Sequence, residues 1–244
     1  MKIICLLEKI KDIQVASLIT KFKSVFSKEF CKRNLFYKYH IDFVPWNDLQ
    51  DLVNKNDELL FLGYDHSITA KIFSGLNLYN RKIIIFDAHN DFTSDEISRE
   101  LLNWNFINYI EKYFTSGLLL GYRHYNTNMN KSKKIHYIHS FELENPQFIA
   151  KKLRKFVKNQ DIYISIDFDI IEPKLFNDVD FPVPGGISYN KLIYYLNLFI
   201  QNSNKVIIDI SEYKVKNNIN ENFKYYKKLL DDIDYLFELK KKIR

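Results

Sequence analysis

The sequence predicts an α/β fold built on one doubly wound, mainly parallel sheet. Short apolar runs alternate with segments of helical spacing along nearly the whole chain. Several runs have no polar alternation, which is typical of strands that are covered on both faces in a parallel sheet. The 244 residues contain no linker of low complexity and no internal repeat, so we expect a single domain over residues 1–244.

The elements are predicted in order from these runs and from the spacing between them. Helices are supported by apolar residues three and four apart, and two of them by start signals: Pro146 after Asn145, and Ser188. Strands are expected at 2–7, 39–44, 58–62, 82–86, 118–120, 135–138, 162–166 and 205–208. Helices are expected at 10–30, 48–53, from 68 onward, 95–114, 146–157, 188–200 and 220–243.

Composition excludes several classes of protein. Hydrophobic residues make up 46% and charged residues 27%, which is ordinary for a soluble globular protein. The net charge of +6 is spread along the chain and is densest in the last helix, so it indicates a solvated helix face and no nucleic-acid partner. Cys5 and Cys31 are too few for a disulfide scaffold. No run approaches the ~18 apolar residues of a membrane span, so we expect a cytoplasmic protein that does not enter a membrane.

Charged side chains follow four of the predicted strands. They lie in Asp65-His66, in Asp87-Ala88-His89-Asn90-Asp91, in Asp167-Phe168-Asp169 and at Glu212. The carboxyl ends of parallel strands share one edge of a sheet, so these groups are expected to gather there. If the second segment stays extended, its two Asp and its His project from one face.

Four Asp and two His in one place are costly unless cations neutralise them. Mixed carboxylate and imidazole ligands suit Mn, Fe, Co or Zn better than Mg or Ca, and six ligands are enough for two ions. Two ions about 3.5–4 Å apart can hold a hydroxide as a nucleophile at neutral pH. The predicted reaction class is therefore hydrolysis of a small-molecule substrate.

Six motifs resemble those of the ureohydrolases, the arginase and agmatinase family, in the same order along the chain. They are GYDHS (63–67), DAHND (87–91), GYR (121–123), SIDFDIIEP (165–173), PGGIS (184–188) and DISE (209–212). The resemblance implies a three-layer α/β/α sandwich around an eight-stranded, mainly parallel sheet. It also implies two Mn(II) ions and hydrolysis of a linear C–N bond in a guanidino or amidine compound.

The resemblance also assigns roles to individual residues. It implies that Glu212 contacts the guanidinium of the substrate and that Asp169 orients the nucleophile besides binding metal. One ion would be held by His66, Asp87, Asp91 and Asp167, and the other by His89 and Asp169 with Asp87 and Asp167 shared.

The chain departs from the family pattern where the substrate is recognised. No His lies between His89 and His124, although the family usually carries a proton-shuttling His there, and no acidic residue follows Arg123 directly. We therefore expect L-arginine to be a poor substrate and a neutral or aromatic tail to fit better. His124 is a candidate shuttle, and the alternative is an ordinary surface His.

Three alternatives stay open from the sequence. Glu212 could be a surface partner of Lys214 or Lys216. The protein could be a deacetylase-like amide hydrolase on the related fold, with Tyr125 and His124 in the polarising and basic roles. It could also be a non-catalytic relative, although a binding module has little reason to keep all six ligands. A homo-oligomer is compatible with every one of these readings.

Overall fold

The computed structural model describes most of the chain from the third strand onward. Side chains are described from residue 58 on, and within the last helix from residue 225 on. The helices expected at 10–30 and 48–53 lie outside the described residues. The described ranges are 2–7, 41–45, 58–63, 65–75, 81–93, 100–124, 131–213 and 219–243.

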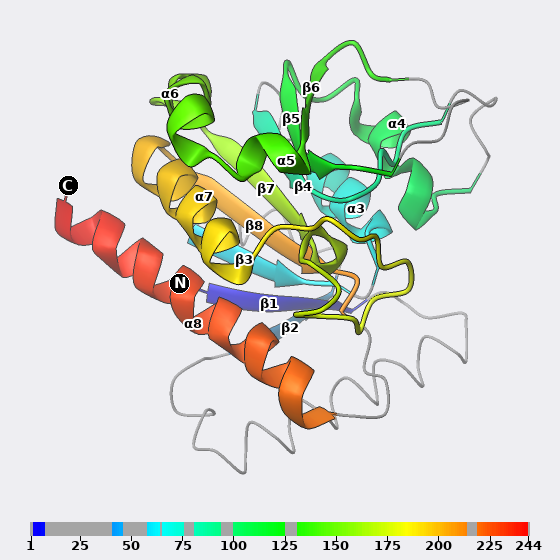
Figure 1. Ribbon diagram of the computed structural model, residues 1–244. Helices are drawn as coiled ribbons and strands as arrows, with labels where there is room; N and C mark the ends of the chain where they lie inside the picture. The colour runs from blue at the N-terminus through cyan, green and yellow to red at the C-terminus, as the bar shows by residue number, and fades with distance from the viewer. Residues whose placement is uncertain are drawn as a thin grey trace.

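The centre of the fold is a parallel sheet in the order β2-β1-β3-β8-β7-β4-β5-β6, with every neighbouring pair parallel (Figure 1). Its central strands β4, β7 and β8 are buried along almost their whole length and are mainly apolar, with Ser165 and Asp209 as buried polar residues of β7 and β8. The strands are β1 (Lys2–Leu7), β2 (Ile41–Pro45), β3 (Glu58–Leu62), β4 (Lys82–Phe86), β5 (Gly117–Tyr122), β6 (Ile135–His139), β7 (Ile162–Asp167) and β8 (Val206–Ser211).

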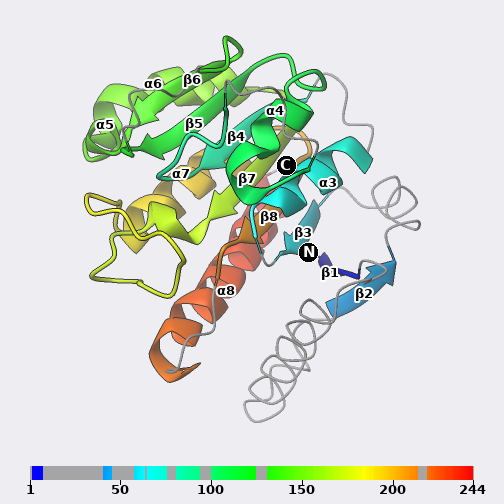
Figure 2. The ribbon, with the colours of Figure 1, turned by 90° about the vertical axis from the view of Figure 1, so that its right-hand side faces the viewer.

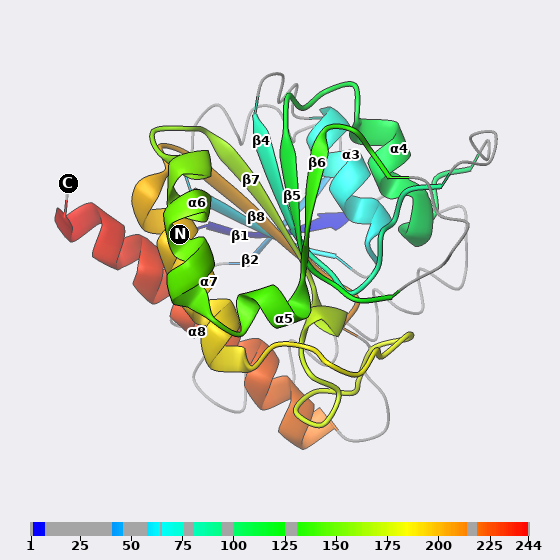
Figure 3. The same ribbon diagram turned by 45° about the horizontal axis from the view of Figure 1, so that its top comes forward.

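Helices cover both faces, so the fold is the expected three-layer α/β/α sandwich (Figure 3). One face packs against α6 (Pro146–Val157), α7 (Tyr189–Asn202) and α8 (Ile219–Ile243), which share a core with Ile84, Ile164 and Ile208 of the sheet. The other face packs against α3 (Ser67–Gly75) and α4 (Phe106–Ile110), which share a second core with Ile83, Ile85 and Ile207. Alternate residues of one strand therefore enter different cores, as the period of two requires.

The helix predicted at 95–114 is only partly present in its described residues, 100–114. Residues 100–102 are not helical, a 3₁₀ turn, η3, spans Asn103–Asn105, and α4 begins only at Phe106. The Asn105 side chain accepts a hydrogen bond from Leu102 N at 2.8 Å and donates one to Glu100 O at 3.1 Å. A side-chain amide that bonds nearby backbone groups offers the chain an alternative to the helix ladder.

Side-chain hydrogen bonds cap the N-termini of two helices, and a proline begins a third. Ser188 Oγ accepts from Lys191 N at 3.4 Å at the start of α7, as predicted. Asn145 precedes α6 without a side-chain bond, and Pro146 supplies the start instead. The short helix α5 (Ser140–Leu143) was not predicted; it is capped by His139, whose ring accepts from Phe141 N at 3.1 Å.

None of the helices in the described ranges is long and apolar enough to cross a membrane.

Candidate metal centre

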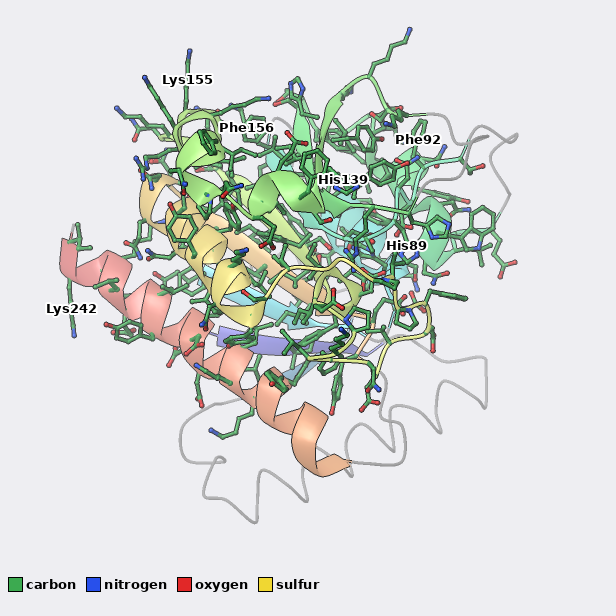
Figure 4. The ribbon with its side chains drawn as sticks, in the orientation of Figure 1. His89, Phe92, His139, Lys155, Phe156 and Lys242 are labelled. Atoms are coloured by element: carbon green, nitrogen blue, oxygen red, sulfur yellow. The ribbon has the colours of Figure 1, made fainter. Side chains whose placement is uncertain are left out.

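The four charged segments meet at the carboxyl edge of the sheet. They follow β3, β8, β7 and β4, which are consecutive neighbours in the sheet order. Figure 2 faces this edge, with the 171–187 loop on one side of the strand ends and α4 near the other. Figure 4 shows His89 at this edge, far from Lys242 at the opposite end of the molecule. Parallel strands whose ends carry charge therefore assemble one site, as expected.

The segment after β4 reaches this site by a turn and not by extension. The strand ends at Phe86, and Asp91 has a φ of +45°, in the left-handed region. His89 N donates to Asp87 Oδ1 at 2.6 Å, which closes the turn. The prediction that Asp87, His89 and Asp91 project from one face of a continuous strand is therefore wrong. A strained φ in a non-glycine residue is typical of functional sites, where the surroundings hold it.

The first group of ligand atoms surrounds His66, which is fully buried. Its Nδ1 lies 3.0 Å from Asp87 Oδ2, 3.1 Å from Asp91 Oδ2 and 3.3 Å from Asp167 Oδ2. Neither His66 Nδ1 nor Asp87 Oδ2 completes a hydrogen bond, although both atoms are buried. Buried polar atoms without partners are rare in folded proteins. Orphaned nitrogen and oxygen atoms that point at one another fit a cation that binds all of them.

The second group lies beside the first and shares a residue with it. His89 Nδ1 is 2.5 Å from Asp169 Oδ2 and 3.5 Å from Asp87 Oδ1. The ligand atoms of His66, Asp87 and Asp167 lie within 4.8 Å of one another, and so do those of Asp87, His89 and Asp169. Asp87 thus presents one oxygen to each group. All six predicted ligands are brought together, and the chemistry of the set fits two divalent ions.

The electrostatics of these residues show what the site needs. Burial and the charge of Asp87 raise the pKa of Asp91 to about 7. Burial, followed by the charges of Asp169 and Asp87, raises the pKa of Asp167 well above its usual range. Burial of the His89 ring lowers its pKa, but hydrogen bonds with Asp169 and Asp87 outweigh this effect and raise the pKa to about 11. The raised pKa values mean that Asp91 and Asp167 keep protons to a higher pH than ordinary carboxyl groups. Bound divalent cations would supply positive charge and take the place of these protons.

A chain of buried hydrogen bonds orients His66 from behind. Its Nε2 is 2.9 Å from Ser165 Oγ, and Ser165 Oγ donates to Asp209 Oδ1 at 2.9 Å. Thr69 Oγ1 donates to Asp209 Oδ2 at 3.1 Å. A proton on Nε2 leaves the lone pair on Nδ1, the atom that faces Asp87, Asp91 and Asp167. Such outer partners orient metal-binding imidazoles and fix their tautomer.

Glu212 lies at the same edge, after β8, and is only 5% exposed. Its φ of +61° lies in the left-handed region, which is typical of non-glycine residues that functional sites hold in place. Oε1 accepts from His66 N at 3.2 Å and from Asn103 Nδ2 at 3.3 Å. Burial contradicts the alternative that Glu212 is an exposed partner of surface lysines.

A cavity of about 230 Å³ opens over these groups. His124 lies at its side, with its ring 4.9 Å from the ring of His89 between centroids. Asn103, Trp104 and Phe181 were not predicted to line the site, because the first two fell inside a predicted helix and the third in a loop without a predicted role. The cavity is lined by His89, Asp91, Asn103, Trp104, His124, Asp167, Asp169, Val179, Asp180, Phe181 and Glu212.

Solved structures that share this fold include a putative agmatinase, an arginase and an agmatine ureohydrolase. A putative agmatinase from Clostridium difficile has a TM-score of 0.73 at 18% identity and covers 100% of this chain and 98% of its own. An arginase from Entamoeba histolytica, in complex with L-ornithine, has a TM-score of 0.70 at 18% identity, covering 95% and 97%. An agmatine ureohydrolase of Thermoplasma volcanium has a TM-score of 0.68 at 20% identity, covering 82% and 73%. Identities this low show the fold alone.

The sequence comparisons add the family. The N(1)-aminopropylagmatine ureohydrolase of Thermus thermophilus is 37% identical over 51 residues, which are 21% of this chain and 17% of that protein. The chain thus aligns with about a sixth of the length of the curated relatives that it matches. The arginase family model matches residues 47–224, which is more than half of the chain. The predicted resemblance is confirmed: the chain belongs to the arginase family.

Proposed function

We propose that this protein is a manganese-dependent hydrolase with two metal ions that cleaves a linear C–N bond in a guanidino or amidine compound. The observation that carries the proposal is the pair of ligand groups that share Asp87. A single ion would need only one group, and a structural role would not need a cavity over the ligands. Membership in the arginase family supports the same reaction class.

The residues divide into two ligand sets. His66, Asp87, Asp91 and Asp167 would hold one ion; His89 and Asp169 would hold the second, together with the shared Asp87 and Asp167. When bound, the two ions supply an activated water as nucleophile at neutral pH and stabilise the negative charge that develops on the substrate. Ligands of this mixed type suit Mn, which is the ion we propose.

Glu212 is the group that binds the guanidinium of the substrate. Its carboxylate faces the cavity and is held by His66 N and Asn103 Nδ2, so little freedom is lost when a cation binds. Asp169 is fixed by Ala88 N, which donates to Oδ1 at 2.9 Å, and this fixed carboxylate orients the attacking water. Both residues therefore act through positions that exist before the substrate arrives.

His124 delivers a proton to the leaving amine in this proposal. Its side chain is exposed at the cavity, and its ring is tilted by 41° to the ring of His89 at 4.9 Å between centroids, so it lies between solvent and the proposed metal ligands. Asn103 cannot transfer a proton at neutral pH, because an amide does not titrate there. Of the cavity residues in the described ranges, His124 is the imidazole that is not a proposed metal ligand.

The experiment is a screen for product release by Mn-loaded protein. Guanidino compounds are assayed for urea, and acetylated amines are assayed in parallel for acetate. We expect urea from at least one guanidine and no acetate. Acetate without urea would replace the proposal with the deacetylase-like alternative. Neither product, from protein shown to contain its metal, would favour a non-catalytic role.

A further inference from the structure

Two large aromatic side chains are kept in solvent at the cavity. Trp104 is 45% exposed and Phe181 is 66% exposed, and both line the cavity together with Asp169 and Glu212. Other large hydrophobic side chains that the described ranges expose, such as Phe141 and Phe148, do not line it. Exposure of aromatic surface to water is unfavourable. A ligand that covers this surface removes it from water, which favours binding. Two exposed rings that line one cavity with the proposed metal ligands are therefore candidates for a binding subsite.

The loop that carries Phe181 is fastened at its base. It leaves and returns to the fold at Ile171 and Ile187, which form a parallel bridge. Glu172 Oε2 accepts from the backbone amides of Gly185 and Gly186, both at 2.9 Å. A Cβ on Gly186 would lie 2.4 Å from Glu172 N, so only glycine fits at this position at the base of the loop. The loop is thus a built wall of the cavity.

Arg123 fastens the same loop at a second point. Its guanidinium donates to Val183 O at 2.8 Å, Asp169 O at 2.6 Å and Gly121 O at 3.1 Å, and the side chain is 7% exposed. Val183 is two residues from Phe181. The ring of Phe181 lies 6.5 Å from that of His89 between centroids. Arg123 therefore acts as a positioning residue that fixes the ring relative to the metal ligands.

Trp104 is positioned from the other side by the turn η3. Its neighbour Asn103 contacts Glu212, and its neighbour Asn105 is bonded to the backbone of Leu102 and Glu100. A guanidinium on Glu212 would thus place the next atoms of the substrate beside this turn. Both rings are held on fixed segments, which reduces the ordering cost of binding.

The charges of the lining decide which tail fits. None of the described lining residues is Lys or Arg, so a carboxylate tail would find no basic side chain there and would face Asp180 and Glu212. An ammonium tail could pair with Asp180, which is the acidic lining residue in the described ranges that is neither a proposed metal ligand nor the proposed guanidinium site. Asp180 is exposed to solvent. An ion pair in water contributes little. Apolar contact with two rings is the larger attraction that the lining offers.

We infer that Trp104 and Phe181 form a tail-binding subsite that selects guanidines with an uncharged, aromatic or apolar tail. This inference rests on the proposed function, since it takes Glu212 as the anchor of the guanidinium. The subsite explains why the chain can lack the acidic residue after Arg123: a tail without an ammonium group does not need it.

The test uses Mn-loaded full-length protein and five guanidines with different tails. Nα-benzoyl-arginine amide has a neutral aromatic tail, agmatine an ammonium, 4-guanidinobutyrate a carboxylate and arginine both charges, while methylguanidine has no tail. We expect kcat/KM for the benzoyl compound to exceed that for arginine at least about a hundredfold, because two charged groups must lose water without partners. Agmatine or arginine turned over as fast as the benzoyl compound would overturn the inference.

Variants locate the preference on the two rings. Phe181→Ala and Trp104→Ala should each lower the ratio of kcat/KM for the benzoyl compound over methylguanidine by about tenfold, mainly through KM. Trp104→Phe should restore most of the ratio. Phe148→Ala is the matched control, because Phe148 is 81% exposed on α6 and does not line the cavity. An unchanged ratio in both alanine variants would refute the subsite.

A binding measurement separates this inference from the proposed function. Calorimetric titration of the benzoyl compound and of agmatine into Mn-loaded protein reports the tail preference without turnover. Tighter binding of the benzoyl compound that Phe181→Ala weakens about tenfold, with no urea released, would support the subsite and contradict the hydrolase. Urea release with equal affinity for both tails would do the reverse.

Discussion

Replacing Glu212 by Gln removes one negative charge from the site and keeps the shape of the side chain. The amide oxygen of Gln can still accept from His66 N and from Asn103 Nδ2, which approach Glu212 Oε1 at 3.2 and 3.3 Å. The fold and the metal ligands should therefore be unaffected. The change isolates the interaction between a carboxylate and a bound guanidinium.

The size of the effect follows from burial. Glu212 is 5% exposed, so solvent screens its interaction with a cation only weakly. A hydrogen bond to a charged group contributes about 1.5–3 kcal/mol, which corresponds to roughly a ten- to 150-fold fall in kcat/KM when the charge is lost. The fall should be similar for every guanidine, because all of them share the group that Glu212 binds.

The assay compares urea release and bound metal in the wild type and in Glu212→Gln. Glu111→Gln serves as the control, since Glu111 also accepts a side-chain hydrogen bond, from Ser132, but does not line the cavity. We expect reduced activity with unchanged metal content in the first variant and neither change in the control. Full activity in Glu212→Gln would show that this carboxylate does not hold the substrate.

Three further outcomes are expected. Asp87→Ala should lose both metals, because the two oxygens of Asp87 face the two ligand groups, whereas His66→Ala should weaken the binding of mainly one. Elemental analysis measures the bound metal, and a greater loss in His66→Ala than in Asp87→Ala would contradict this assignment. In metal-free protein the pKa of Asp91 is raised from 3.8 to about 7, so folding binds a proton and stability should fall as pH rises through that window. The melting shift on adding Mn should therefore be larger near about pH 8 than near about pH 5, and an equal shift would contradict the proton and metal competition. Gly121→Ala should cost about 1–3 kcal/mol in denaturant unfolding, because Gly121 has a φ of +97° and a Cβ there would meet Ile170 Cδ1 at 1.8 Å; an unchanged midpoint would show that the loop relaxes freely.

The sheet could be predicted because its strands carry their own signal. The structure places β3 at Glu58–Leu62 and β4 at Lys82–Phe86, the same bounds as the apolar runs predict. Burial on both faces leaves no polar alternation, so such runs are visible in the sequence. The meeting of the charged segments followed from one rule, that parallel strands end at the same edge.

Other features depend on contacts that the sequence does not display. The turn after β4 is closed by the bond from His89 N to Asp87 Oδ1, and the loss of helix before Phe106 depends on the Asn105 amide. Both are side-chain to backbone bonds that compete with regular structure. Trp104 and Phe181 line the same cavity only because separate segments of the chain pack around it, and the sequence does not display that packing.

The most direct measurement is the number of Mn ions bound per chain. The protein is purified, stripped with a chelator, saturated with Mn, freed of excess metal and analysed for metal and protein. The shared position of Asp87 between two ligand groups predicts two ions per chain. A value at or below one ion per chain under saturating Mn would contradict the account of a site with two metal ions.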